Sequence, residues 1–341
     1  MFLTAPIVWL QSWTSPGLTR AMEVISWFGY TRTAIALAVF IAFAFRLRAG
    51  MALLLLLGLT SLATDVAKTT AGLPRPFAVD PAVRILGWPA PAPVRWGTAA
   101  AGWWDPPRRT PPPSTVIAGE RANAADSETG FGFPSGHIST TATFVAGLAG
   151  LIGLAGRRWV RVAGAAWLTL MAVSRLYLGR HFIADLLGGL ALGGLVVGLG
   201  MTMLRLSVLA QSPTSREVAQ AALINALVAA ALLGVSLIAG RPDIGDAGRL
   251  AGIALAVLLL TRSGMVHLPP RPMARAGLVT IAATSYALVW AALTLGLQPS
   301  RGPASTASRL AASALPAFAM LVAPAASVRM NRSAAFARRD A

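Results

Sequence analysis

Long blocks of apolar residues constrain this chain more than any other feature of its sequence. Blocks of about 17 to 23 residues recur along it, the length that a helix needs to cross a hydrocarbon core about 30 Å thick. Charged residues make up only 12% of the 341 residues, whereas a soluble domain carries roughly 25%. We therefore predict an all-α fold, a polytopic bundle of transmembrane helices.

Most charged residues are basic, and their positions in the chain indicate whether they bind nucleic acid or set the membrane topology. The formal net charge is +17, which in a soluble protein would indicate a nucleic-acid partner. Here the arginines cluster between apolar blocks, as the positive-inside rule describes for cytoplasmic turns. We therefore expect no nucleic acid, and we place the N-terminus and a long proline-rich loop outside the cytoplasm. The arginine-bearing segments are residues 46–48, 157–161, 205–216, 262–275 and 329–339.

The N-terminal half is read as an interfacial segment followed by a transmembrane core. Residues 1–28 interleave tryptophans with polar side chains and suit an amphipathic helix in the headgroup layer. Met1 to Leu10 lack a basic n-region and a small-residue cleavage site, so we expect no removable signal peptide. Residues 29–206 form the core. Its segment 69–133 holds nine prolines between Pro81 and Pro113, which disfavour regular helix, so we predict an extracytoplasmic loop there.

A second apolar half follows the core. Residues 207–218 are a polar linker, and residues 219–341 predict a C-terminal transmembrane domain of about four helices. Its small residues suit close helix packing, and docking onto the core, homodimerisation and lipid binding are three roles open to it. The nine spans expected in all lie near residues 31–45, 51–67, 138–156, 159–178, 184–204, 219–239, 249–266, 276–297 and 307–328.

Three short polar segments fall at span ends that this topology assigns to the outer membrane face. The first runs from Lys68 to Pro76, and Lys68 is the only lysine among 29 basic residues. The compact ammonium suits anion binding, with chance or snorkelling at a helix end as the alternative. The second segment, Pro134 to His137, places Ser135 and Gly136 where the first turn of a helix offers unpaired N–H groups. Such a terminus binds anions, although it can also be a simple helix cap.

The third segment runs from Ser174 to Asp185 and contains a histidine and a carboxylate in one short stretch. His181 and Asp185 are spaced to share a face if they lie on a helix, so the carboxylate can accept the Nδ1–H while Nε2 acts as a nucleophile. An isolated pair of this kind is more often a surface ion pair. At a membrane boundary, where ionisable groups are costly, a functional role is the default.

With these segments in view, the chain closely resembles the type 2 phosphatidic acid phosphatase superfamily. The signature of that family is Lys-x6-Arg-Pro, then Pro-Ser-Gly-His, then Ser-Arg-x5-His-x3-Asp, and all three are complete here over roughly residues 20 to 205. The resemblance implies a catalytic transmembrane core, to which the C-terminal helices are an addition.

The resemblance also implies separate roles for the residues of the signature. His181 would attack phosphorus and become a phosphohistidine, Asp185 would orient it, and His137 would serve as acid and base. Lys68, Arg75 and Arg175, with Ser135 and Gly136, would bind the phosphate oxygens. No metal or cofactor is required, and the outer segments hold no compact carboxylate cluster of the kind that a two-metal phosphatase needs.

These implications define an expected function, with two alternatives kept open. We expect a multi-pass enzyme of the plasma (inner) membrane that hydrolyses a lipid phosphate or diphosphate at the extracytoplasmic face. Its partners would be the membrane lipids and a substrate such as phosphatidic acid, phosphatidylglycerol phosphate, a polyprenyl diphosphate or a sphingoid base phosphate. One alternative is a phosphotransferase that passes the phosphoryl group to a lipid or sugar. The other is a lipid transporter or scaffold without catalysis.

Several residues outside the signature invite weaker hypotheses. Asp65 is placed to restrain Lys68 across one helical turn, Arg180 is expected to be a surface arginine, and His267 is expected to be structural. The tryptophans of the long loop are expected to anchor it to the membrane interface, with a lid over the substrate as the alternative. These tryptophans are Trp88, Trp96, Trp103 and Trp104.

Overall fold

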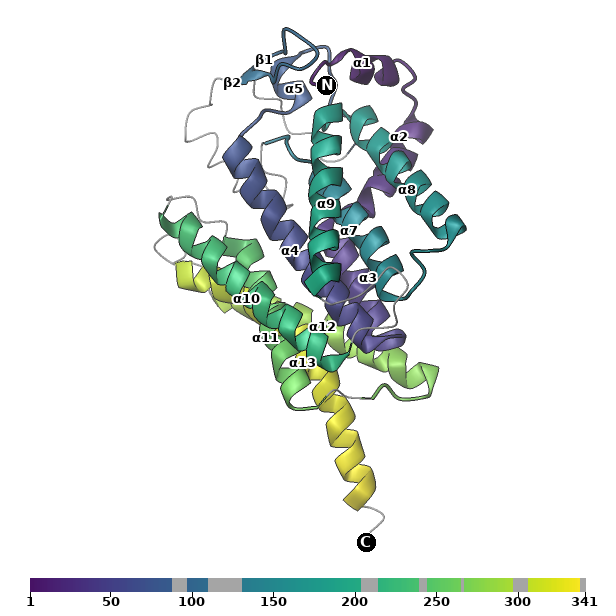
Figure 1. The fold of residues 1–341 in the computed structure, drawn as a ribbon, viewed down its shortest axis with the longest axis vertical. Helices are drawn as coiled ribbons and strands as arrows, with labels where there is room; N and C mark the ends of the chain where they lie inside the picture. Colours follow the sequence, from purple (N-terminus) through teal and green to yellow (C-terminus); the bar gives the residue numbers. More distant parts are fainter. Residues whose placement is uncertain are drawn as a thin grey trace. The chain divides into compact units, whose positions relative to one another are not determined.

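The computed structural model of the chain is an all-α protein, as expected (Figure 1). It describes residues 1–87, 97–109, 131–203, 214–238, 244–264, 267–296 and 306–337. Strand structure in these residues is limited to an antiparallel pair, β1 (Gly97–Thr98) with β2 (Arg108–Arg109). The helices are α1 (Ala5–Gln11), α2 (Pro16–Trp27), α3 (Thr31–Ala44), α4 (Leu47–Ala71), α5 (Pro76–Val79), α7 (Gly136–Leu151), α8 (Arg158–Tyr177), α9 (Ile183–Met203), α10 (Ser215–Ile238), α11 (Ile244–Arg262), α12 (Pro272–Gly296) and α13 (Thr306–Ala337).

Helices form at all nine places where spans were expected, but fewer of them pass a test of length and apolarity. Within the described residues, four helices are long and apolar enough to cross a membrane: α4, α9, α12 and α13. The bent pair α2 and α3, with 55° between its two helices, raises the number to five if it is counted as one span. Helix α7 has only 16 residues, and α8 carries arginines that lower its hydropathy. The structure therefore supports a polytopic protein. The nine spans expected exceed the four or five that meet these two criteria among the described residues.

The chain divides into two compact units, of which unit 1 lies wholly within the expected N-terminal half and unit 2 takes residues from both halves. Unit 1 comprises Met1–Ala34, Ala63–Val145 and Arg158–Leu195, and unit 2 comprises Ile35–Leu62, Ala146–Arg157 and Val196–Ala341. Every residue of the family signature lies in unit 1. The expected linker lies mostly outside the described residues, as do Trp88 and Trp96.

The N-terminal segment forms two helices rather than the single interfacial helix that we expected. Ser15 adopts an extended conformation, its side chain accepts the Leu18 N–H, and Pro16 opens α2, so a new helix begins there. Both helices pack on α8. Gln11 at the end of α1 is buried and donates to the carbonyl oxygens of Arg84 (2.7 Å) and Tyr177 (3.0 Å).

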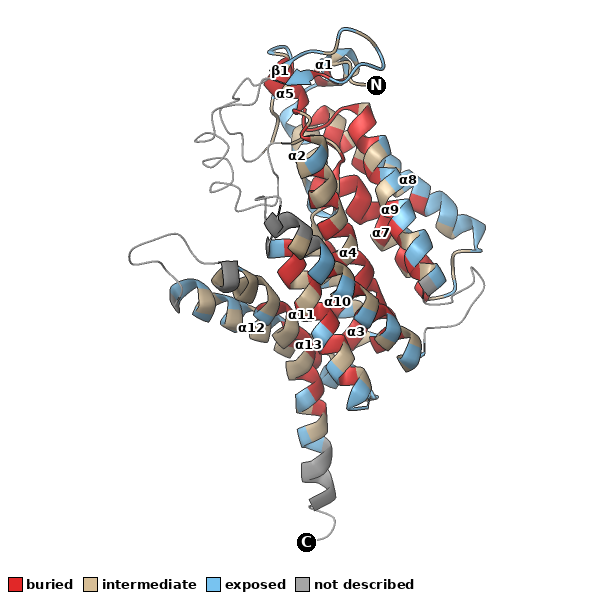
Figure 2. Ribbon diagram, turned by 60° about the vertical axis from the view of Figure 1, so that its left-hand side comes forward, coloured by how far each residue is buried: buried red, intermediate tan, exposed pale blue. Residues whose placement is uncertain are grey.

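Burial along α8 is uneven (Figure 2). Its C-terminal part buries Met171, Arg175 and Tyr177, whereas Trp159 and Val162 near its beginning are largely exposed. Apolar residues that are exposed on a helix of a membrane protein are suited to contact with lipid. The buried end of α8 is therefore the part that contributes to the interior of unit 1.

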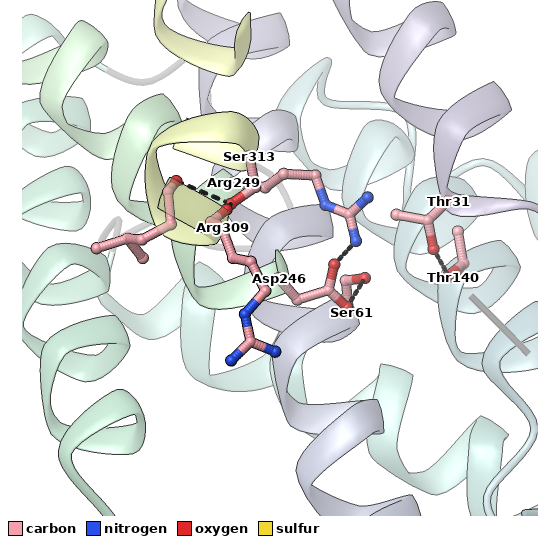
Figure 3. Close-up of polar contacts among 8 residues, drawn as sticks. Thr31, Ser61, Thr140, Asp246, Arg249, Arg309 and Ser313 are labelled. Atoms are coloured by element: carbon pink, nitrogen blue, oxygen red, sulfur yellow. Dashed lines mark hydrogen bonds and ion pairs between the residues drawn. The ribbon is translucent and has the colours of Figure 1, made fainter. Parts of the chain in front are cut away.

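Unit 2 contains the four C-terminal helices α10 to α13. Helix α11 packs on α10 and α13, and α13 packs on α12. Asp246 in the first turn of α11 is buried, accepts a hydrogen bond from Ser61 of α4 (2.9 Å) and pairs with Arg249 one turn later (Figure 3). Partners of this kind are what a buried carboxylate requires.

Glycines allow α7 and α9 to approach each other closely in unit 1. A Cβ atom at Gly193 would lie 2.6 Å from the Ser139 carbonyl oxygen and 3.0 Å from the Ala142 Cβ. The neighbouring Gly194 has no atom within 4 Å of such a Cβ among the described residues. The two glycines are adjacent in α9, but only Gly193 lies in close contact with α7.

We predict that Gly193→Ala destabilises the protein by roughly 1–3 kcal/mol, because the added methyl group overpacks the contact with α7. Gly194→Ala is the matched control and should be neutral or stabilising by about 0.5–1 kcal/mol, since alanine is the better helix former. Thermal unfolding of both variants in the same detergent measures the difference. Equal unfolding temperatures would show that the close approach does not contribute to stability.

Candidate active site

The beginning of α9 holds the histidine and the carboxylate of the third segment. His181 precedes the helix rather than lying on it, so the two residues do not share a helical face as the spacing suggested. Asp185 is the third residue of α9, and its Oδ2 accepts the Phe182 N–H (2.9 Å), the reach-back bond of a capping box. The same oxygen lies 3.2 Å from His181 Nδ1. One carboxylate oxygen thus caps the helix and holds the imidazole.

This hydrogen bond determines the chemistry available to His181. Both side chains are buried, so the pair is shielded from water. When Nδ1 donates its hydrogen to the carboxylate, the lone pair of the neutral ring lies on Nε2. In this tautomer the carboxylate orients the ring as in a catalytic triad, and Nε2 is the nitrogen available for nucleophilic chemistry.

The segment from Pro134 to His137 forms the beginning of α7, as predicted. Ser135 precedes the helix, and its carbonyl oxygen accepts the Ser139 N–H (3.1 Å). The Ser135 N–H donates to the main-chain oxygen of Asp185 (2.9 Å), which ties the beginning of α7 to the first turn of α9. The Ser135 hydroxyl is buried and has no hydrogen-bond partner among the described residues. It is a polar atom suited to contact a bound ligand.

The segment from Lys68 to Pro76 reaches the same place from the end of α4. The Arg75 guanidinium donates through Nη1 to the carbonyl oxygen of Arg180 (3.1 Å), the residue before His181. Lys68 and Arg75 both act electrostatically on the carboxyl group of Asp185. Both basic side chains are buried, which is costly without an anion nearby. Their location fits binding of a phosphate group.

The end of α8 explains the spacing between Arg175 and His181. Gly179 has a φ of +75° and terminates the helix, while the Arg180 N–H returns to the Arg175 carbonyl oxygen (3.0 Å). This is the Schellman arrangement, in which glycine takes the left-handed position. The turn reverses the chain toward α9, so that Arg175 and His181 are held in one compact structure.

Gly132, two residues before Pro134, contacts both the first and the third signature segments. Its N–H donates to the Leu73 carbonyl oxygen (2.7 Å), and a Cβ at this position would lie 2.9 Å from Asp185 Oδ2. Its neighbour Phe131 pairs with Pro74 in an isolated bridge. The structure therefore links the three signature segments by backbone contacts. Of the eight predicted site residues, Lys68, Arg75, Ser135, His137, Arg175, His181 and Asp185 are buried and Gly136 is partly exposed.

Some residues near the site were missed or misread in the sequence. Arg180 is buried, with 7% of its surface exposed, so it is not the surface arginine that we expected. Ser26 and Tyr30 contact Arg175 and His137, and nothing in the sequence pattern distinguished them from the interfacial segment around them. Asp65 and Lys68 are both buried on α4, and their pairing stays a prediction.

Among the described residues, no group of three or more His, Cys, Asp or Glu side chains is arranged to hold a metal ion. The candidate site is instead rich in cations, hydroxyl groups and the N–H groups of helix termini. These are the donors that proteins use for phosphate oxygens.

Comparison with known proteins agrees with the motif resemblance. Residues 49–208 match the model of the PAP2 superfamily, and all three signature segments lie inside this range. The chain therefore contains a PAP2 superfamily domain, which confirms the resemblance seen in the sequence. Searches of curated proteins and of solved structures found no match to this chain.

We predict that Asp185→Ala lowers the free energy of unfolding by about 1–3 kcal/mol, because it leaves the buried Phe182 N–H without its acceptor. Asp185→Asn is the control, since its amide oxygen can still accept that hydrogen bond. Thermal unfolding in detergent should therefore rank the Asn variant above the Ala variant. If the two variants unfold at the same temperature, the hydrogen bond from the Phe182 N–H to residue 185 does not contribute to stability.

Proposed function

We propose that this protein is an integral membrane phosphatase that hydrolyses a lipid phosphate or diphosphate through a phosphohistidine. The observation that carries the proposal is the buried hydrogen bond between His181 Nδ1 and Asp185 Oδ2, beside the cations Lys68 and Arg75 of the first segment. A surface ion pair would be solvated and of little consequence. A buried, oriented imidazole next to Lys68 and Arg75 is what phosphoryl transfer to nitrogen requires.

The first half of the proposed reaction forms the phosphohistidine. The lone pair of His181 Nε2 attacks phosphorus in line, and the bond from phosphorus to the lipid oxygen breaks. His137 gives its proton to the departing oxygen. Asp185 stabilises the positive charge that His181 acquires, while Lys68, Arg75 and Arg175 offset the charge on the phosphoryl oxygens.

The second half returns the enzyme to its starting state. His137, now neutral, accepts a proton from water as the water oxygen attacks phosphorus. The bond between phosphorus and Nε2 breaks, inorganic phosphate leaves, and both histidines regain their original protonation. This chemistry requires no metal ion, because the fixed cations and the α7 terminus supply the charge stabilisation. Unchanged phosphate release in the presence of a chelator supports this part of the proposal, and loss of it counts against it.

A lipid is the proposed substrate because the site belongs to a chain with several membrane-crossing helices. The positive-inside rule supports an extracytoplasmic position, since the arginine-rich turns fall at the opposite ends of these helices. The PAP2 superfamily match supports phosphatase or phosphotransferase chemistry on lipid phosphates in general. Release of inorganic phosphate by the purified protein without an acceptor separates hydrolysis from phosphotransfer.

We predict that the wild-type protein, incubated with a ³²P-labelled lipid phosphate and quenched in alkali, retains label on histidine. His181→Asn should retain none and should lose at least about 10³-fold of its phosphate release, because the nucleophile is missing. His267→Asn is the matched control, since this exposed histidine lies far along the chain from the signature segments. Label that persists in His181→Asn would overturn the assignment of the nucleophile.

We predict that the site end of α4 can be labelled from outside the cell. The chain has no cysteine, so a single introduced thiol is a specific reporter. Thr70→Cys lies at an exposed position two residues after Lys68, and Gly156→Cys lies in the exposed turn before α8. In intact cells an impermeant maleimide should label the first variant only, and both after permeabilisation. Labelling of Gly156→Cys alone would reverse the proposed orientation.

A further inference from the structure

The turn between α2 and α3 contacts two predicted site residues. We define the α2–α3 elbow as residues 26–31, from Ser26 to Thr31. It lies in unit 1 together with the signature segments, but it precedes the residues matched by the PAP2 model. Its contacts are therefore a feature of this chain that the family match does not assign.

Ser26 holds the side chain of Arg175. Its hydroxyl oxygen accepts a hydrogen bond from Arg175 Nη1 at 2.7 Å, and both residues are buried. A guanidinium is planar and presents five N–H donors in a fixed fork. Fixing Nη1 therefore sets the plane in which the other donors point. A cation with a fixed orientation is more effective at binding phosphate oxygens than one that must be ordered during the reaction.

Gly29 and Tyr30 hold the ring of His137. The Tyr30 and His137 rings meet edge to face, with 4.6 Å between centroids and 62° between planes. A Cβ at Gly29 would lie 2.6 Å from His137 Cδ2 and 2.9 Å from Met171 Sδ, so only glycine allows the backbone this close. Rotation of the imidazole is restricted on the side that faces the elbow.

Thr31 attaches the elbow to α7 at the next turn. Its hydroxyl group lies 3.3 Å from that of Thr140, one helical turn beyond His137 (Figure 3). The elbow thus contacts α7 at two successive turns and α8 at Arg175. These contacts come from residues of one short segment, so the elbow contacts both the proposed acid-base residue and the proposed phosphate-binding arginine.

We propose that the α2–α3 elbow positions two groups of the reaction, Arg175 through Ser26 and His137 through Gly29 and Tyr30. This inference rests on the proposed function for the chemistry of the two groups. The two contacts act on different steps, because Arg175 binds the phosphoryl oxygens whereas His137 transfers protons. A Ser26 variant should therefore lose anion affinity, whereas a Tyr30 variant should lose protonation of the leaving group. A general loss of folding would not separate these two effects.

The Ser26 contact is tested by binding of orthovanadate, an anion that resembles the transferring phosphoryl group. Ser26→Ala should weaken orthovanadate inhibition and orthovanadate-induced thermal stabilisation by about tenfold in affinity, because Arg175 loses its orienting acceptor. Ser26→Thr keeps the hydroxyl group and should restore affinity. Val24→Ala, on the exposed side of the same helix, is the control and should match the wild type. Equal affinity in Ser26→Ala and the wild type would overturn the role of Ser26.

The Tyr30 contact is tested by the leaving group in the first turnover. Tyr30→Leu should slow release of an alkyl alcohol from an alkyl phosphate by about tenfold, since His137 must protonate this leaving group. Release of p-nitrophenolate, which leaves without a proton, should slow by less than about threefold. Tyr30→Phe retains the ring and should behave as the wild type on both substrates. An equal loss on both substrates would overturn the positioning role.

The same assays separate failure of this inference from failure of the proposed function. If the wild type releases phosphate, His181→Asn does not, and the elbow variants equal the wild type, only the elbow proposal is wrong. If the wild type releases no phosphate, the proposed function is wrong. Orthovanadate-induced stabilisation of the wild type, reduced in Ser26→Ala and restored in Ser26→Thr, would then still support the role of Ser26 in holding an anion-binding arginine.

Discussion

The rest of the site depends on the hydrogen bonds that Asp185 accepts through its carboxylate and through its main-chain oxygen. The side chain caps α9 through Phe182 and orients His181, while the main-chain oxygen accepts the Ser135 N–H at the beginning of α7. One residue therefore fixes two helix termini and the proposed nucleophile, His181, relative to one another. Because these groups are buried, water does not compete for their hydrogen bonds, and the loss of these contacts would leave polar groups without partners.

Buried charge is the second constraint on this region. In the described part of unit 1, four basic side chains are buried, against the two buried carboxylates Asp65 and Asp185. The basic residues are Lys68, Arg75, Arg175 and Arg180. Burial of excess positive charge opposes folding unless an anion offsets it, and a phosphate ester supplies that anion. The imbalance thus links the electrostatics of the fold to the class of ligand that we propose.

The residues of the candidate site lie at helix ends. Lys68 ends α4, Arg175 ends α8, and His137 and Asp185 lie in the first turns of α7 and α9. Helix termini are the places where a membrane helix can offer backbone groups to a ligand. The N-terminal helices add a layer of support, because α1 packs on α8 and the α2–α3 elbow contacts Arg175 and His137. The site is therefore also held by segments that precede the signature in the chain.

The sequence by itself determined the all-α class, the nine helical segments and the three signature segments, because apolar block length and local spacing encode them directly. It predicted the contact between His181 Nδ1 and the Asp185 carboxylate, but not that Asp185 makes this contact while capping the first turn of α9. Nor did it indicate that Arg180 is buried or that Ser26 and Tyr30 reach the site. Only the tertiary structure decided these points, because they are contacts between residues as many as 149 positions apart, such as Ser26 and Arg175. Such contacts are set by helix packing and chain reversal, which leave no periodic pattern in the residues themselves.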